Sequence, residues 1–443
     1  MTTPRHASSF TAIPNNRLPV IIAGARTPFL DSAGLYAELM SYELGAHALR
    51  GLLENAQVDP TAIELVIMGT VLHEVETTNV AREAMLAAGL PSRIPAYTVA
   101  MAGISPNVGV MNLCDQIALG RLDLGIAAGT ENFSDVPVRL SQNIRRLLMK
   151  LRQRKGTRER LKALGSLRPS DLSFDIPTGS DYTTGMTMGV ACEAMVRKFG
   201  LTRNACDAYT ARSHAGAIAA TQAGHYAAQI TPVTIASGEV ARDDNTPRAD
   251  ATEVRLATLP PVFDRQQGII TAGNASRFTD GAAALLLGSL GRAKAEGRQP
   301  LAVVRDYLLT GVDSLETEML LGPAMSIPRL LARNSLSFDD IGVWEIHEAF
   351  AAQVLINRAC MADANFVHER LGRECPVGEI PMDALNPWGG SLSLGNPFAA
   401  TGGRLFMTAC QRLQASGQRY AVISTCAGGG LGAAILLEHP DAL

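Results

Sequence analysis

PVIIAG at residues 19–24 is followed by LMSYELGAHALRGLLENA at 39–56, ELVIMG at 64–69 and AREAMLAAG at 81–89. The first and third segments are short apolar runs, which are typical of buried strands, whereas the second and fourth repeat apolar residues at helical spacing. This alternation predicts a layered α/β fold. LDLGIAAG at 122–129 is apolar almost throughout and ends in glycine, which predicts another strand that is buried on both faces.

A similar series recurs in the second half of the chain. It comprises AVVRDYLL (302–309), SIPRLLARN (326–334), DIGVWEIH (340–347), a helix through LINRACMA (355–362), a helix at 399–416 and the strand YAVISTC (420–426). The recurrence predicts two similar βαβ-rich halves. We place the N-terminal half at residues 1–293 and the C-terminal half at residues 294–443.

An insertion of different character interrupts the first half at about residues 133–255. It contains two helical segments, GVACEAMVRKFG (189–200) and RNACDAYTARSHAGAIAATQAG (203–224), with a basic run before them. At 145–162 this run carries Arg145, Arg146, Lys150, Arg152, Arg154, Lys155, Arg158, Arg160 and Lys162 against a single acid, Glu159. Such a run is explained equally by a solvated helical face and by a surface that docks phosphate groups, an anionic membrane or a partner subunit.

The composition sets broad limits on function. Of the 443 residues, 47% are hydrophobic and 18% are charged, which excludes disorder for the bulk of the chain. The net charge of −3 provides no broad basic field, so we expect no nucleic-acid partner. The seven cysteines show no CxxC spacing, which argues against disulfides and zinc and fits the cytoplasm, or the mitochondrial matrix in a eukaryote. No apolar run reaches the roughly 18 residues of a membrane span.

Four stretches resemble thiolases, most closely the β subunit of the β-oxidation trifunctional complex. They are RTPF (26–29), TAGNASRFTDGAA (271–283), WEIHEAF (344–350) and the pair formed by NPWGGSLSLGNPFAATGGR (386–404) and CAGGGLG (426–432). His347 stands where other thiolases carry asparagine, and Thr187-Met188 where others carry His-Met. Together with SDVPVR at 134–139, these positions favour the trifunctional subgroup.

The resemblance covers almost the whole chain and implies a thiolase fold. Five layers, αβαβα, would result, with a sheet and an interior helix from each half and the insertion as a loop domain. The resemblance also implies acyl-CoA thioesters as substrates, acyltransferase activity in lipid metabolism such as fatty acid β-oxidation, and no permanently bound cofactor. A homodimer or higher homo-oligomer and a hydratase/dehydrogenase partner subunit are further expectations. No set of metal ligands is visible in the sequence.

The nucleophile of thiolases is missing. Thiolysis of a β-ketoacyl thioester needs a sulfur nucleophile, a base that activates it, and an acid that protonates the leaving carbanion. In the family, that nucleophile follows the strand that here reads PAYTVAM (95–101), at the start of an interior helix whose dipole lowers the pKa of a thiol. This chain carries Gly103 there, and glycine cannot form an acyl intermediate. Cys114 lies about 16 Å further along the helix axis and cannot substitute.

The histidine that activates the nucleophile in the family is missing as well. Asn396 takes its place in GNPFAATG (395–402), where Ala399 also replaces a family glycine. An amide can donate a hydrogen bond to an oxyanion but cannot take up a proton as a base. Loss of both groups indicates natural divergence of the site.

Other family residues are retained. Cys426 matches the acid/base cysteine, and His347 matches an oxyanion-hole position, although a buried strand-end thiol and a satisfied polar histidine are the ordinary alternatives. The backbone N–H groups of Gly103 and Gly428 are expected to form a second oxyanion hole, because main-chain donors survive the loss of a side chain. The GGGLG run does not fit a dinucleotide loop, since no βαβ unit follows it.

Three more residues are candidates for binding the pantetheine arm of coenzyme A. Ser276 matches a family position that contacts this arm, and we expect Met188 and Phe350 to line the same tunnel. Ordinary packing is the alternative for all three.

Three functions remain open from the sequence. The first is a thiolase-like acyltransferase-family enzyme with a degenerate active site, which acts on a CoA thioester by noncovalent carbon–carbon chemistry such as retro-aldol cleavage, decarboxylation or direct acyl transfer. The second is a conventional 3-ketoacyl-CoA thiolase with another nucleophile. The third is a non-catalytic subunit that binds acyl-CoA or acts as a scaffold.

Overall fold

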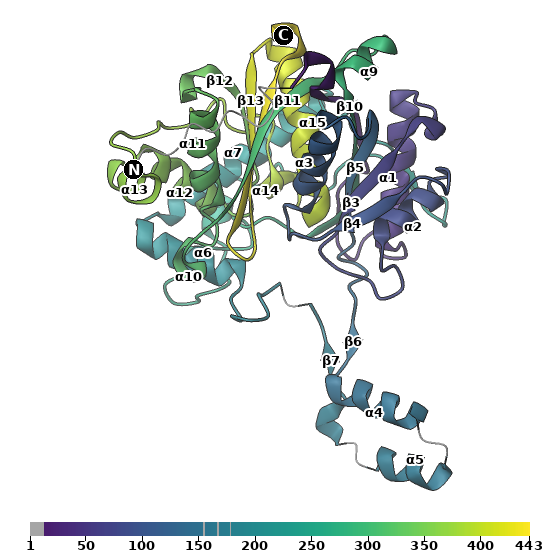
Figure 1. Ribbon diagram of the computed structural model, residues 1–443. Coiled ribbons are helices and arrows are strands. Elements are labelled where there is room, and N and C mark those ends of the chain that lie inside the picture. Colours follow the sequence, from purple (N-terminus) through teal and green to yellow (C-terminus); the bar gives the residue numbers. More distant parts are fainter. Residues whose placement is uncertain (1–12, 154–155, 166–167, 178) are drawn as a thin grey trace.

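A single mixed sheet of ten strands forms the centre of the protein (Figure 1). The computed structural model describes residues 13–153, 156–165, 168–177 and 179–443. The sheet strands are β1 (Pro19–Arg26), β2 (Leu30–Asp31), β3 (Leu65–Gly69), β4 (Ala96–Val99), β5 (Leu124–Glu131), β10 (Thr279–Ser289), β11 (Ala302–Gly311), β12 (Ile341–Ile346), β13 (Tyr420–Ala427) and β14 (Leu431–Glu438). Their order is β12-β13-β14-β11-β1-β10-β5-β3-β4, and β2 pairs with β10.

The two halves repeat one topology, as the sequence predicts. In the first half β3 and β5 are parallel, and β5, β10 and β1 then pair antiparallel. In the second half β12 and β13 are parallel, and β13, β14 and β11 pair antiparallel in the same way. The expectation of a separate sheet in each half is only partly correct, because β1 and β11 join through Val20↔Val303 and Ile21↔Ala302. This short pairing satisfies backbone groups that two free edges would leave unpaired.

The helices complete the five-layer αβαβα arrangement, which confirms the predicted fold class. Helices α1 (Ser41–Ala56) and α2 (Val80–Ala87) cover the outer face of the first half, and α11 (Gly322–Arg333) and α12 (Ala351–Ala362) lie on the outer side of the second. Between the halves lie α3 (Ser105–Ala118) and α15 (Phe398–Ser416). Helix α15 contacts strands of both halves, β5 and β10 on one side and β12 and β13 on the other. The interior helices therefore connect the two halves.

The remaining helices surround this core. They are α6 (Met188–Phe199), α7 (Arg203–Gln222), α8 (Glu253–Ala257), α9 (Leu290–Ala295), α10 (Leu315–Glu318), α13 (Ala364–Leu371) and α14 (Ser391–Leu394), and a short hairpin is formed by β8 (Val233–Thr234) and β9 (Val240–Ala241). Helices α6 and α7 contact α12, so this part of the insertion packs on the second half.

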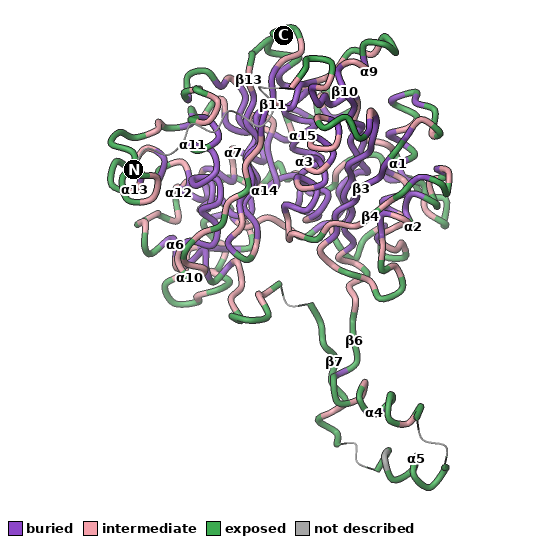
Figure 2. The backbone as a smooth tube through the Cα atoms, viewed as in Figure 1, coloured by how far each residue is buried: buried purple, intermediate pink, exposed green. Residues whose placement is uncertain are grey.

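The basic part of the insertion projects away from the body as an arm (Figure 1). Its stem pairs β6 (Arg139–Leu140) with β7 (Phe174–Asp175), and α4 (Gln142–Gln153) and α5 (Thr157–Leu164) pack on each other at its end. Most of the arm is exposed (Figure 2). Apolar Leu148, Met149 and Leu161 are exposed beside the basic side chains, whereas Arg154 and Lys155 lie outside the described residues.

Helix α15 begins in direct contact with β5. A Cβ atom added to Gly129 would lie 1.7 Å from the carbonyl oxygen of Ala399 and 2.6 Å from its carbonyl carbon. Backbone cannot yield as a side chain can, so any side chain at Gly129 would force the two elements apart. By contrast, a Cβ on Gly109 in α3 would meet Ile67 Cγ2 at an ordinary 3.4 Å.

We therefore expect Gly129→Ala to lower the free energy of unfolding by about 3 kcal/mol or more, through overpacking against α15. Gly109→Ala is the matched control, and it should be neutral or stabilising by up to about 1 kcal/mol because alanine favours a helix interior. Urea unfolding of both variants measures these effects. Equal stability of the two would contradict this description of the β5–α15 contact.

Candidate functional site

Six of the eight residues predicted for the site line one cavity of about 190 Å³. They are Gly103, Met188, His347, Asn396, Cys426 and Gly428. Gly103 follows β4, His347 follows β12, and Cys426 and Gly428 lie at the end of β13 and in the turn after it. Strands β12 and β13 are parallel, with Ile346 opposite Ser424, so both deliver their last residues to one edge of the sheet.

The backbone around Gly103 is tightly fixed although its side-chain space is empty. Ala102 has a φ of 47°, a left-handed conformation that costs energy for a residue with a Cβ. The Ser105 hydroxyl holds this turn, because it accepts from the N–H of Met101 at 2.8 Å and donates to the carbonyl of Ala102 at 2.6 Å. A Cβ added to Gly103 would meet no described heavy atom within 4 Å outside its chain neighbours. The site thus has room for a side chain at this position.

His347 is buried and neutral at physiological pH. Burial lowers the pKa of its ring to about 3, and the positive charge of Arg404 contributes. Its Nδ1 lies 2.9 Å from Ser391 Oγ, which accepts a hydrogen bond from Arg404 Nη2 at 3.0 Å. A guanidinium can only donate, so the hydroxyl hydrogen of Ser391 is free to point to Nδ1. When Ser391 donates to Nδ1, the single ring hydrogen of His347 lies on Nε2.

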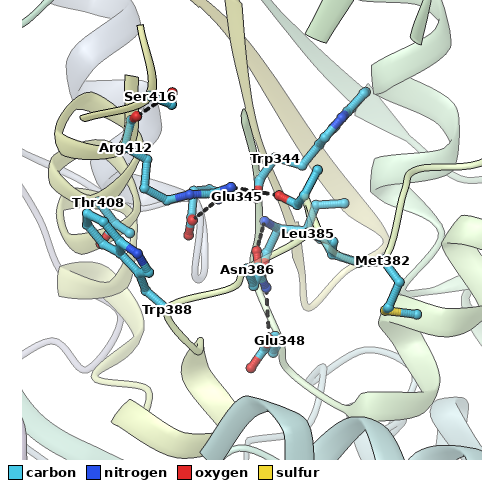
Figure 3. A network of polar contacts seen from close by, with 12 residues as sticks. Trp344, Glu345, Glu348, Met382, Leu385, Asn386, Trp388, Thr408, Arg412 and Ser416 are labelled. Atoms are coloured by element: carbon cyan, nitrogen blue, oxygen red, sulfur yellow. Dashed lines mark hydrogen bonds and ion pairs between the residues drawn. The ribbon is translucent and has the colours of Figure 1, made fainter. Parts of the chain in front are cut away.

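A buried polar network supports the end of β12 (Figure 3). His347 directly follows this strand. Arg412 Nη1 donates to the carbonyl of Trp344 at 2.9 Å and to Glu345 Oε1 at 2.5 Å. The N–H of Ile346 donates to Asn386 Oδ1, and Asn386 Nδ2 donates to Glu348 Oε1, both at 2.8 Å. Backbone positions on both sides of His347 are therefore fixed by buried hydrogen bonds.

Asn396 has a fixed amide orientation. Thr401 Oγ1 donates to its Oδ1 at 2.9 Å, and its Nδ2 donates to Ser276 Oγ at 3.1 Å. The second Nδ2 hydrogen has no partner among the described residues, so Asn396 can donate to a ligand in the cavity. Ser276 does not line the cavity and is reached through Asn396.

Phe350, predicted to line the tunnel of the pantetheine arm, does not line this cavity. Its ring packs into the apolar core of the second half, 6.3 Å from the Phe263 ring in an edge-to-face contact. The neighbouring Ala349 lines the cavity in its place. Phe350 directly precedes α12, and its side chain is buried.

Cys426 carries a protonated thiol at neutral pH. It is 2% exposed, and burial raises its pKa to about 12. A thiol in this state can give up a proton to a carbanion but is a poor nucleophile. Cys114 is also buried, its pKa is raised by burial, and it does not line the cavity.

Comparison with known proteins identifies the family. The chain matches the model of the thiolase N-terminal domain over residues 19–290 and that of the thiolase C-terminal domain over residues 298–439. The protein is a member of the thiolase family. Mitochondrial trifunctional enzyme subunit beta of Mus musculus is 39% identical over 96% of this chain and 89% of its own length. A probable 3-ketoacyl-CoA thiolase of Caenorhabditis elegans is 38% identical, over 98% of this chain and 97% of its own length.

Solved thiolase structures share the fold. A complex of human mitochondrial 3-ketoacyl-CoA thiolase with CoA gives a TM-score of 0.81 at 27% identity, and it covers 98% of this chain and 100% of the human chain. Acetyl-CoA acetyltransferase of Bacillus anthracis gives a TM-score of 0.81 at 31% identity, with 95% and 98% of the two chains covered. The resemblance to thiolases predicted from the sequence motifs is thereby confirmed.

This thiolase-family chain has a second, basic hollow of about 200 Å³ that the sequence analysis did not find. Arg248, Arg255, Arg277 and His214 line it together with Asp250. Arg277 directly follows Ser276, so the hollow lies next to the residue that holds Asn396. The basic residues come from distant parts of the chain, which is why no sequence motif revealed them.

Two polar residues of the cavity were also missed. Ser180 and Asp181 line it from the turn that precedes α6. In the sequence, only their proximity to Met188 indicates that they belong to the site. Among the described residues, no group of three or more His, Cys, Asp or Glu side chains is placed to hold a metal ion. None of the described helices is long and apolar enough to span a membrane.

Alkylation should separate the cysteines by their burial. Cys375 is exposed and the other six are buried, so iodoacetamide should modify Cys375 first in the native protein. With a pKa of about 12 against an ordinary value of about 9, Cys426 should react about a thousandfold more slowly than a free thiol at pH 8. Its rate should rise about tenfold per pH unit. Peptide mass spectrometry measures the labelling rates of Cys375 and Cys426, and urea-unfolded protein serves as the control. Rapid labelling of Cys426 in the native protein would contradict the protonated state assigned to its thiol.

Proposed function

We propose that this thiolase-family protein binds an acyl-CoA thioester and catalyses carbon–carbon bond chemistry without an acyl-cysteine intermediate. One observation carries the proposal: Gly103 faces open space where the family nucleophile is expected, while Cys426, His347 and Asn396 surround the same cavity. Such a site can stabilise an enolate and exchange a proton at its α-carbon, but it holds no thiolate to accept an acyl group.

The division of roles follows from the hydrogen-bonding capacity of each group. His347 donates from Nε2, and Asn396 donates from Nδ2, to oxygen atoms on which negative charge develops. The N–H groups of Gly103 and Gly428 are main-chain donors at the same cavity. Cys426, as a buried thiol, protonates the α-carbon.

Binding of coenzyme A is supported by the basic hollow beside Ser276. Coenzyme A carries phosphate groups, and guanidinium groups such as those of Arg248 and Arg255 bind phosphates through several hydrogen bonds. Met188 lines the reaction cavity, where it can contact the pantetheine arm. Coenzyme A is then substrate rather than a permanent cofactor.

The setting of the protein is a further part of the proposal. We propose a homodimer or higher homo-oligomer, with a hydratase/dehydrogenase partner subunit, because relatives are beta subunits of a trifunctional enzyme. The exposed arm, with cations and apolar side chains in α4 and α5, offers a docking surface for that partner or for an anionic membrane. A location in the cytoplasm, or in the mitochondrial matrix of a eukaryote, fits the mitochondrial relatives.

A conventional 3-ketoacyl-CoA thiolase is the second candidate, since relatives carry this name. It would need another nucleophile, and Cys426 is the one cysteine that lines the cavity. The burial that raises its pKa to about 12 disfavours that role. A non-catalytic acyl-CoA-binding subunit would show no turnover on any CoA ester.

Replacement of Cys426 tests the proton-transfer role. Cys426→Ala should abolish exchange of the α-hydrogens of bound acetyl-CoA with deuterated water, while the affinity for coenzyme A changes less than about twofold. In the unmodified protein, exchange should accelerate about tenfold per pH unit between pH 7 and 9, because it requires the thiolate of a group with a pKa of about 12. Cys410→Ala removes an equally buried thiol with the same raised pKa and should leave exchange unchanged. Persistent exchange in Cys426→Ala would refute the role.

Restoring a thiol tests the absence of the nucleophile. Gly103→Cys should fold normally, since its side chain enters free space, yet thiolysis of acetoacetyl-CoA should stay close to the level of the parent protein because Asn396 cannot activate the thiol. Gly103→Cys combined with Asn396→His should raise thiolysis by at least about a hundredfold over the single variant. Intact mass after incubation with acyl-CoA reports the acyl adduct. An adduct that forms on the parent protein at the rate of turnover would favour the conventional thiolase.

A further inference from the structure

Asp181 is the only carboxylate among the described residues that line the cavity. Its Oδ2 is shielded from solvent and has no hydrogen-bond partner in the described structure. Its Oδ1 lies 4.0 Å from the position of a Cβ built on Gly429, in the turn that follows Cys426. An unpaired carboxylate oxygen at a ligand cavity is a strong acceptor without a donor, and a substrate can supply one.

The backbone directs Asp181 to this place. Its N–H donates to the carbonyl of Met186 at 3.0 Å, and its carbonyl accepts from the N–H of Gly185 at 2.7 Å. Ser180 and Thr187 form an antiparallel bridge across the same turn. The turn leads into α6, whose first residue, Met188, also lines the cavity and lies 3.8 Å from a Cβ position on Gly428. The carboxylate is thus held against the β13–β14 turn.

The other titratable groups of the cavity cannot take up a proton near neutral pH. Cys426 already carries its proton, since burial raises its pKa to about 12. His347 has a pKa of about 3, and its Nδ1 is engaged with Ser391. A reaction that must remove a proton from its substrate therefore depends on a different acceptor, and Asp181 is the remaining candidate at this cavity.

We propose that Asp181 is the general base of a retro-aldol cleavage and that the substrate is a β-hydroxyacyl-CoA thioester. This inference rests on the noncovalent chemistry proposed above. Asp181 takes the proton of the β-hydroxyl, the carbon–oxygen double bond forms, and the bond between the α- and β-carbons breaks. The electron pair of the broken carbon–carbon bond becomes part of the thioester enolate, which is stabilised by His347, Asn396 and the backbone amides. Cys426 then protonates the α-carbon, and the proton on Asp181 returns to the thiolate through water, so atoms and charges balance.

The competing noncovalent reactions differ from retro-aldol cleavage in what they require of the site. Decarboxylation of a thioester that carries a carboxylate on its α-carbon needs no base, and it would bring a second carboxylate next to Asp181, where like charges repel. Direct acyl transfer to a thiol would also need a proton acceptor, but it consumes a second substrate such as free coenzyme A. Retro-aldol cleavage uses both the unpaired acceptor and the protonated thiol on a single substrate.

The test compares cleavage and exchange in one set of variants. The full chain is incubated with racemic β-hydroxyacyl-CoA esters of short, medium and long acyl chain, with and without a methyl branch at the β-carbon. Mass spectrometry then measures the two products, which are the aldehyde or ketone and the shortened acyl-CoA. Asp181→Asn keeps the size of the side chain and should lower kcat for cleavage about a thousandfold. Asp181→Glu should retain a measurable part of the activity, and Asp135→Asn, which alters an exposed carboxylate of the same insertion, should change nothing.

Exchange of α-hydrogens in acetyl-CoA serves as the second readout. It uses Cys426 and the oxyanion donors and not the proposed base, so Asp181→Asn should lose at least about a hundredfold more of its cleavage rate than of its exchange rate, and measurable exchange also demonstrates that the variant is folded. Exchange without cleavage of any β-hydroxyacyl ester by the parent would overturn the retro-aldol inference and leave the proposed function intact. Equal cleavage by parent and Asp181→Asn would overturn the role of Asp181. Absence of exchange in the parent would overturn the proposed function, and the inference with it.

Discussion

Close packing of α15 between the two halves is the constraint on which the site depends. At Gly129 the helix start touches β5 with no room for a methyl group, and strands of the second half cover the opposite side. A helix buried over most of its length must also bury polar residues, of which Arg404 is fully enclosed. This burial brings the guanidinium to Ser391, whose hydroxyl is in turn hydrogen-bonded to Nδ1 of His347.

The same burial sets the protonation state of the cavity. Removing a group from water disfavours its charged form, which lowers the pKa of His347 and raises that of Cys426. Both groups are therefore neutral hydrogen donors at physiological pH. A site of this kind stabilises negative charge on the substrate without carrying negative charge of its own on these two groups. The sequence motif identifies the residue types, but only packing decides their protonation.

Much of the fold could be predicted because its strands and helices show clear periods. The segments at β1, β3, β12 and β13 are recognisable as apolar runs, and the recurrence of the series predicts two similar halves. Strand β10, with the sequence TDGAAALLLGS, was not recognised, since alanine and glycine have low strand propensity. Six of the eight predicted site residues share the cavity, whereas Phe350 turns to the core. Asp181 was missed because a lone acid in a turn has no periodic pattern, and its contact with the β13–β14 turn arises only on folding.

The protonated state of Cys426 also bears on the direction in which such a site works best. To form an enolate from a saturated acyl thioester, the enzyme needs the thiolate, of which a group with a pKa of about 12 provides about one part in 10⁵ at pH 7. To quench an enolate that bond cleavage has already produced, the resting thiol is ready. Burial of Cys426 therefore favours a reaction that breaks a carbon–carbon bond first and transfers a proton to carbon second. An ordinary thiolase needs a thiolate nucleophile for the first of these steps, and under the proposed function Gly103, with free space beside it, stands in place of that nucleophile.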